Sequence, residues 1–106
     1  DIARIAVCTG IADREPEGKA ESFGSDVGKL YCFTHVKGVQ DTLAIQHKWY
    51  HGDELRSTVP LNVRSSSWRT YSSKTLDPSW IGEWRVDVVD GESGDVLAST
   101  TFVVAE

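Results

Sequence analysis

A short segment near the middle of the chain combines side chains that bind anions with side chains that stack on flat ligands. Residues 65–76 read SSSWRTYSSKTL, and SWIGEW follows at 79–84. Aromatic rings stack on sugar rings, and Arg and Lys hold carboxylate or sulfate groups. The segment therefore predicts a site for an anionic glycan or for an acidic segment of a partner protein. The expected ligand-binding residues are Trp68, Arg69, Tyr71, Lys74 and Trp80.

Charge is unevenly distributed along the sequence. The net charge is −5, yet residues 55–76 contain Lys and Arg and not one Asp or Glu. The overall acidity argues against nucleic acid as a partner, because phosphate binding needs a basic face. The basic window favours anion binding, but a structural alternative stays open. Arg69 would then pair inside the molecule with Asp77, Glu83 or Asp87, and Arg14 would pair with its neighbours. The chain would then be a structural spacer or accessory domain.

The spacing of the other reactive residues indicates neither a metal site nor a catalytic site. His47 and His51 have the i, i+4 spacing of helical metal ligands, but their segment alternates as a strand does. Four residues of strand span about 13 Å, which is too far for one metal ion. No Gly-x-Ser-x-Gly elbow is present, and nothing in the sequence selects a pair of carboxylates. We therefore expect no metal, no cofactor and no enzymatic activity, and a small hydrolase is the least favoured alternative.

The elements that must position these residues are almost all β-strands. Apolar and polar residues alternate in 42–50, 67–73 and 83–90 with the period of a half-buried strand. Further strands are expected at 2–8, 28–36, 95–105 and 54–63, the last as a strand pair or as one strand bent at Pro60. Between them lie a charged loop at 12–26, a hairpin turn at 51–53 and a corner at 76–82. This pattern predicts a single domain, residues 1–106, folded as an all-β, immunoglobulin-like antiparallel β-sandwich.

The alternation also assigns positions to the tryptophans. Trp49 and Trp84 fall on the apolar faces of their strands and are expected in the core. His47, on the same face as Trp49, is expected to be half-buried and hydrogen-bonded. Trp68 shares its face with hydroxyl-bearing residues, and Trp80 follows a proline corner. We expect one of these last two to fill the core and the other to be exposed.

The two cysteines, Cys8 and Cys32, lie in apolar segments that are expected to be strands. Neither belongs to a Cys-x-x-Cys pair, so their spacing indicates no metal or redox motif. Two interpretations stay open. The cysteines are either buried free thiols that behave as small hydrophobic residues, or they form a disulfide between neighbouring strands of an exported domain.

Six segments of the chain carry a resemblance to a known family. In order along the chain they are TGIADREPEG, LYCFTHVKG, HKWYHGDEL, VPLNV, WRTYSSKTL and GEWRVDVVDGESGDVL. Together they resemble the bacterial family known as domain of unknown function 2914. The resemblance implies a β-sandwich module of the bacterial cell envelope, periplasmic or membrane-associated, and implies no enzymatic activity. The cysteines depart from the usual pattern of that family, so a Cys8–Cys32 bond would be particular to this protein.

The ends of the sequence suggest a piece of a larger protein. The chain begins at Asp1 without a signal peptide, and no apolar run reaches the roughly 18 residues that span a membrane. We therefore expect an envelope domain whose membrane attachment lies in segments outside this sequence.

Overall fold

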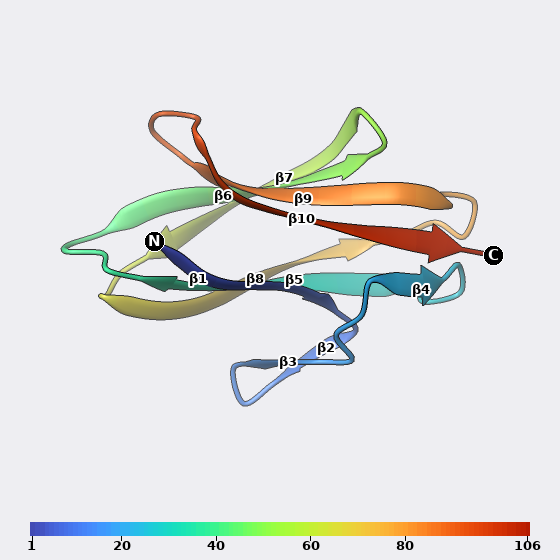
Figure 1. Cartoon of the computed structure of the whole chain (residues 1–106), viewed down its shortest axis with the longest axis horizontal. Helices are drawn as coiled ribbons and strands as arrows, with labels where there is room; N and C mark the ends of the chain where they lie inside the picture. Colours follow the sequence, from blue (N-terminus) through green and yellow to red (C-terminus); the bar gives the residue numbers. More distant parts are fainter.

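Two β-sheets pack face to face and enclose the hydrophobic core (Figure 1). In a computed structural model, which describes residues 1–106, the chain forms ten strands and no helix. It therefore contains no helix with the length and apolarity needed to cross a membrane. The strands are β1 (Ile2–Cys8), β2 (Gly10–Ala12), β3 (Glu15–Glu17), β4 (Ser22–Gly24), β5 (Lys29–Lys37), β6 (Leu43–His51), β7 (Glu54–Val63), β8 (Ser67–Thr75), β9 (Gly82–Asp90) and β10 (Val96–Ala105).

The strand order is that of an immunoglobulin-like sandwich. The smaller sheet has the order β1-β5-β8, and the larger sheet has the order β4-β10-β9-β6-β7. In immunoglobulin lettering these are strands A, B and E packed against A′, G, F, C and C′. Neighbouring strands are antiparallel, except that the short β4 runs parallel to β10. The predicted all-β, immunoglobulin-like sandwich is confirmed.

The core consists of the inward-facing residues of strands whose sequences alternate. Trp49 on β6 and Trp84 on β9 are both buried, as their positions in the alternation predicted. The ring of Trp84 stacks on Phe102 at 5.9 Å and on His51 at 4.8 Å, and Trp49 meets the same Phe102 ring edge-on at 6.2 Å. Complete burial of a large apolar side chain stabilises a fold by about 3 kcal/mol. These rings therefore contribute much of the energy that holds the sheets together.

Trp68 and Trp80 both occupy the margin of the core, which corrects the expectation that one would be buried and the other exposed. Each is partly buried. Trp80 packs against the cluster that contains Trp84, and Trp68 packs against a separate cluster around Val36. The register explains the position of Trp68, because it lies opposite Val36 and therefore on the inner face of β8, which is an edge strand.

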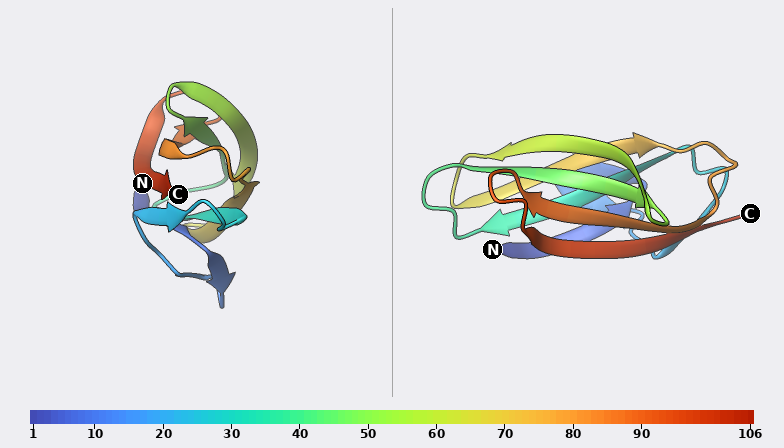
Figure 2. Two further views of the ribbon diagram at one scale, coloured as in Figure 1. Left: turned by 90° about the vertical axis from the view of Figure 1, so that its right-hand side faces the viewer. Right: turned by 90° about the horizontal axis from the view of Figure 1, so that it is seen from above.

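Residues 12–26, predicted to be a loop, contain the short strands β3 and β4 and the last residue of β2. β2 and β3 form a hairpin whose turn residues, Asp13 and Arg14, have φ angles of 51° and 61°. This hairpin projects from the outer side of the smaller sheet (Figure 2). The loop prediction was wrong here because a tight hairpin with two left-handed residues usually carries Asn-Gly or Asp-Gly. Arg in the second position gives no such signal.

Residues 54–63 form one strand, β7, rather than a pair of strands. The strand lies at the edge of the larger sheet, where Pro60 is tolerated because edge residues need not donate to a second neighbour. The turn that precedes β7 contains Gly52 with a φ angle of 61°, as the predicted hairpin at 51–53 requires.

Cys8 and Cys32 are free buried thiols in the structure, so they do not form the disulfide that was the alternative interpretation. The register pairs Val7 with Cys32 and Cys8 with Tyr31. Successive residues of a strand point to opposite faces. Cys32 therefore faces the core, whereas Cys8 faces the outer side, where its thiol contacts the Tyr31 carbonyl oxygen at 3.8 Å.

Candidate functional site

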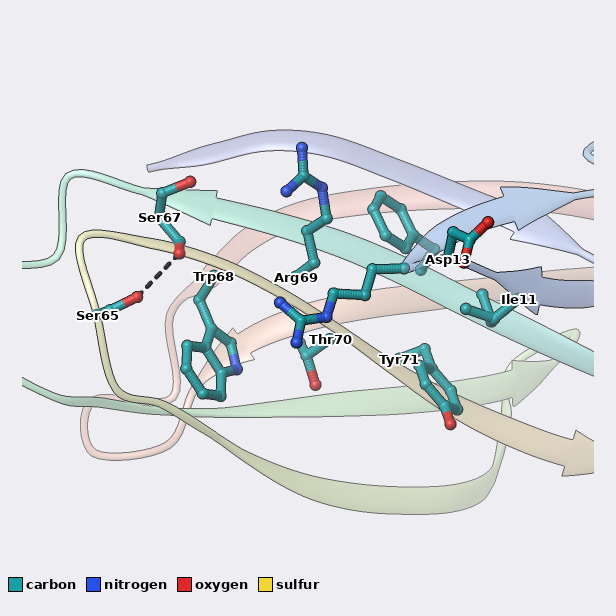
Figure 3. A pocket seen from close by; sticks show the side chains of 10 residues that line it. Ile11, Asp13, Ser65, Ser67, Trp68, Arg69, Thr70 and Tyr71 are labelled. Carbon is teal, nitrogen blue, oxygen red and sulfur yellow. Dashed lines mark hydrogen bonds between the residues drawn. The ribbon is translucent and has the colours of Figure 1, made fainter.

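A hollow of about 580 Å³ lies beside β8 on the smaller sheet (Figure 3). Its walls come from two parts of the chain that are distant in sequence. The β2–β3 hairpin contributes the turn residues Asp13 and Arg14, and β8 contributes the consecutive residues 67–71. Phe33 on β5 forms part of the floor. The sequence pattern predicted the β8 side of this site but gave no signal for the hairpin side.

The hollow follows the free edge of β8. Alternate residues of a strand point to opposite faces, so a surface lined by consecutive residues must wrap around the strand's edge. Trp68 and Thr70 come from the inner face of β8, and Arg69 and Tyr71 come from the outer face. Because β8 is hydrogen-bonded only to β5, no neighbouring strand covers this edge.

Arg69 takes part in an exposed ion-pair cluster with residues of β1 and β3. Its Nε atom lies 3.0 Å from Glu15 Oε2, and Arg4 Nη1 donates to Glu15 Oε1 at 2.8 Å. The hydrogen bond from Arg4 and the positive charges of both arginines lower the pKa of Glu15. Arg69 therefore does have an intramolecular partner, but this partner is Glu15 and not Asp77, Glu83 or Asp87. Asp87 instead lies 3.1 Å from Arg85.

Arg14 is the unpaired cation of the hollow. Its guanidinium makes no ion pair or side-chain hydrogen bond, and it does not stack on an aromatic ring. A left-handed conformation costs a residue with a Cβ atom about 1 kcal/mol. The turn thus carries backbone strain that glycine would relieve, and it places a guanidinium at the wall of the hollow. Strain of this kind is often found at functional sites.

An aromatic ring and several hydroxyl groups complete the surface of the hollow. Tyr71 is 50% exposed and packs edge-on against Tyr31 with 5.8 Å between ring centroids. Ser67 and Thr70 add hydroxyl groups, and Ser65 donates its hydroxyl to the Ser67 carbonyl oxygen at 2.8 Å. The hollow therefore offers guanidinium groups, a half-exposed ring and hydroxyl groups, which together suit a polar anionic ligand.

Lys74 and Trp80, the two other residues predicted for the site, lie outside the hollow. Lys74 Nζ lies 5.7 Å from the centre of the Trp80 ring, and Arg56 lies 5.2 Å from the same ring. These three residues form a separate cation–aromatic group, which we call the Trp80 cluster. The alternation of β8 causes the separation, because Lys74 falls on the inner side of the strand and Arg69 on the outer side.

Comparison with known proteins places this chain in a family. The family profile described as "Protein of unknown function (DUF2914)" matches residues 43–104, more than half of the sequence. The chain belongs to the DUF2914 family. No curated protein matches it significantly. The DUF2914 match includes the β8 side of the hollow, whereas Arg14 and Phe33 lie outside the matched residues.

A buried polar network crosses the core of this DUF2914 chain and was not predicted as such. His47 Nδ1 lies 2.6 Å from Ser72 Oγ, and its Nε2 lies 2.8 Å from Thr34 Oγ1. Trp49 donates its indole N–H to Ser72 Oγ at 3.1 Å. Burial lowers the pKa of His47 to about 4, so the imidazole is neutral at pH 7. His47 was expected to be half-buried, but it is completely buried.

The Ser72–His47 pair resembles the first two members of a catalytic triad in its residue types and its hydrogen-bond distance, but not in its access to a substrate. Ser72 Oγ already accepts the Trp49 N–H, and both residues of the pair lie beneath the sheet surfaces. A nucleophile must reach a substrate carbonyl, and a buried hydroxyl does not. In this structure the pair acts as a polar cross-link between the two sheets.

Proposed function

We propose that this DUF2914 chain is a non-catalytic binding module of the bacterial cell envelope, and that the hollow beside β8 binds an anionic ligand. The observation that carries the proposal is Arg14, an unpaired guanidinium held in a strained turn at the wall of the hollow. The ligand supplies carboxylate or sulfate groups, from an acidic glycan or from an acidic segment of a partner protein.

The local charge supports an anion rather than a cation. Three guanidiniums, those of Arg4, Arg14 and Arg69, and two carboxylates, those of Asp13 and Glu15, lie in or beside the hollow. The ion pairs in this group are exposed, and such pairs contribute less than about 1 kcal/mol. Arg69 can therefore exchange part of its contact with Glu15 for a ligand carboxylate at little cost.

The test compares Arg14→Gln with Arg56→Gln, which removes the same charge from the Trp80 cluster. Binding of a sulfated glycan and of an acidic peptide is measured by isothermal titration at two salt concentrations. We expect Arg14→Gln to weaken binding about tenfold, because it removes a charged hydrogen bond, and Arg56→Gln to leave binding unchanged. Added salt should weaken binding to the parent, since exposed charges are screened over about 8–10 Å. Equal affinity of the parent and Arg14→Gln would overturn the proposal.

A structural spacer or accessory domain is the second candidate function. The pairing of Arg69 with Glu15 favours it, because this cation already has an internal partner. A spacer would bind none of the acidic probes at any salt concentration, and Arg14→Gln would then change nothing but the local charge.

A further inference from the structure

The sandwich has four edge strands, and three of them are interrupted or short. β1 has a bulge between Ile2 and Arg4, and β7 has both Pro60 and a register shift beside Trp49. β4 contains only three residues. Proteins commonly protect their edges from added strands with such bulges, prolines and short strands.

The edge formed by β8 lacks these interruptions. Its nine residues pair with β5 in an unbroken register, and the strand contains no proline. No neighbouring strand covers its far side. This is the edge that the hollow follows, so an open backbone edge and an anion-binding surface lie at the same place.

The hydrogen-bond pattern shows which backbone groups of β8 are free. Gly38 donates its N–H to the Ser66 carbonyl oxygen at 2.9 Å, and Leu76 donates to Gly28 at 2.8 Å. In an antiparallel pair, hydrogen-bonded and non-hydrogen-bonded positions alternate. The even-numbered residues of β8 therefore bond to β5. The N–H and C=O groups of Arg69, Tyr71 and Ser73 point away from the sheet, toward solvent.

We propose that β8 accepts an extended acidic peptide of a partner protein as an additional strand of the smaller sheet. The inference rests on the proposed function, because the acidic side chains of the peptide would occupy the hollow. The free backbone groups of β8 would supply affinity, and side-chain pockets would supply specificity, as in other proteins that bind a peptide by strand addition.

The two faces of β8 define the side-chain pattern of the peptide. Residues that lie opposite each other on neighbouring strands share a face. Peptide residues beside Arg69 and Tyr71 would meet the guanidiniums of the hollow and should be Glu or Asp. Those beside Trp68 and Thr70 would lie over the margin of the core and should be apolar. The expected ligand therefore alternates acidic and apolar residues.

A second copy of the chain is a poor occupant for this edge. An edge-to-edge dimer would bring the hollows of two copies, each with Arg14 and Arg69, to one shared edge, and β8 itself carries no acidic residue. Like charges placed opposite each other across a strand pair are destabilising. An acidic peptide complements the same cations.

The experiment uses two peptides as long as β8 and identical in composition. One alternates Glu and Val, and the other carries the same residues in two blocks. Binding of the blocked peptide measures the attraction between charges alone. Binding of the alternating peptide measures the same attraction together with strand pairing. We expect the alternating peptide to bind about tenfold more tightly, and Arg14→Gln to weaken both.

Two further measurements test the backbone contact. In one, the alternating peptide is N-methylated on either set of alternate residues. Because each set of N–H groups points to one side of a strand, one methylated peptide should lose binding and the other should keep it. In the other, Ser73→Pro removes a free edge N–H without removing a bond to β5, and Ser73→Ala is its control. Ser73→Pro should weaken binding of the alternating peptide and leave the blocked peptide unchanged.

The outcomes separate the inference from the proposed function. If both peptides bind equally and both need Arg14, anion binding stands and strand addition is overturned. If neither peptide binds, both proposals fail for acidic peptides. A concentration-dependent dimer that Ser73→Pro abolishes would show that the β8 edge binds a second copy of the chain. That result would overturn the proposal that β8 binds a peptide. Should Ser73→Pro fail to fold, the N-methylated peptides decide the question, and equal binding of the two would refute the inference.

Discussion

The Nδ1 atom of His47 lies 2.6 Å from the Oγ atom of Ser72, and this contact joins β6 of the larger sheet to β8 of the smaller sheet. Both side chains are buried, and the second ring nitrogen of His47 contacts Thr34. Every polar atom of the imidazole therefore has a partner, which a buried polar group needs in order not to destabilise the fold. The network also requires a neutral imidazole, whose pKa is lowered by burial to about 4.

Acidification should destabilise the protein through His47. In the unfolded chain this histidine takes up a proton below pH 6.5, but in the folded chain only near pH 4. The unfolded state therefore holds more protons between these values, so the free energy of unfolding falls as the pH falls. We expect a loss of about 2 kcal/mol between about pH 7.5 and about pH 5, measured by urea unfolding.

The control for this prediction is His47→Gln, which does not titrate. The variant should be less stable at neutral pH, and its stability should fall less steeply on acidification. His35, whose pKa is lowered by burial and by the charges of Arg69, Lys37 and Arg4, contributes equally to both proteins and cancels in the comparison. Identical pH slopes for parent and variant would show that His47 is not the buried titrating group.

Truncation of Trp84 should cost far more stability than truncation of Trp68. Trp84 is 1% exposed and stacks on two rings, so Trp84→Ala should lower the free energy of unfolding by about 3–5 kcal/mol. Trp68 lies at the margin of the core, so Trp68→Ala should cost about half as much. Denaturant unfolding of the two variants gives the comparison. A loss under about 1 kcal/mol for Trp84→Ala would mean that β9 has the opposite phase.

Cys32 should resist alkylation in the folded protein. Burial, with a smaller contribution from the charge of Cys8, raises the pKa of Cys32 to about 12, and burial also raises the pKa of Cys8. Only the thiolate is a good nucleophile, so native protein should react slowly at about pH 8. Denaturation without reductant should expose two reactive thiols, counted by mass spectrometry. Denatured protein that takes up no alkyl group until it is reduced would reveal a disulfide.

Two replacements of Arg14 should differ in their effect on the free energy of unfolding but not in their effect on anion binding. Arg14→Gly relieves the left-handed strain at this turn position and should raise the free energy of unfolding by about 1 kcal/mol. Arg14→Ala retains a Cβ atom, so it should bring no such gain. Both variants should lose anion affinity to the same extent. If Arg14→Gly were no more stable than Arg14→Ala, the turn would not be strained.

Arg69 and Lys74 should differ in their effect on ligand binding, although both lie on β8. Arg69→Ala removes a guanidinium from the hollow and should weaken anion binding about tenfold. Lys74→Ala alters the Trp80 cluster and should leave binding unchanged. Melting curves serve as the control, and Arg69→Ala should be nearly as stable as the parent. The lost Arg69–Glu15 contact is exposed and contributes less than about 1 kcal/mol. A larger effect of Lys74→Ala would move the site to the Trp80 cluster.

The sequence alone determined the class of fold and the phase of the longest strands. Alternation is a local property of a strand, so the inward positions of Trp49 and Trp84 could be assigned before any contact was known. The same alternation placed Arg69 and Tyr71 on one face of β8. The hairpin turn at 51–53 could also be predicted from a local feature, because the positive φ angle at Gly52 favours glycine.

Only the tertiary structure decided which of these residues meet. The hollow joins Arg14 to Arg69 through the packing of a hairpin on a sheet, and the hairpin lacks the glycine that would have signalled its turn. The separation of Lys74 from Arg69, the free thiols and the His47–Ser72 contact all depend on how strands pair across long stretches of sequence. Register and sheet packing are set by the sum of many weak contacts between distant residues, and no local pattern encodes that sum.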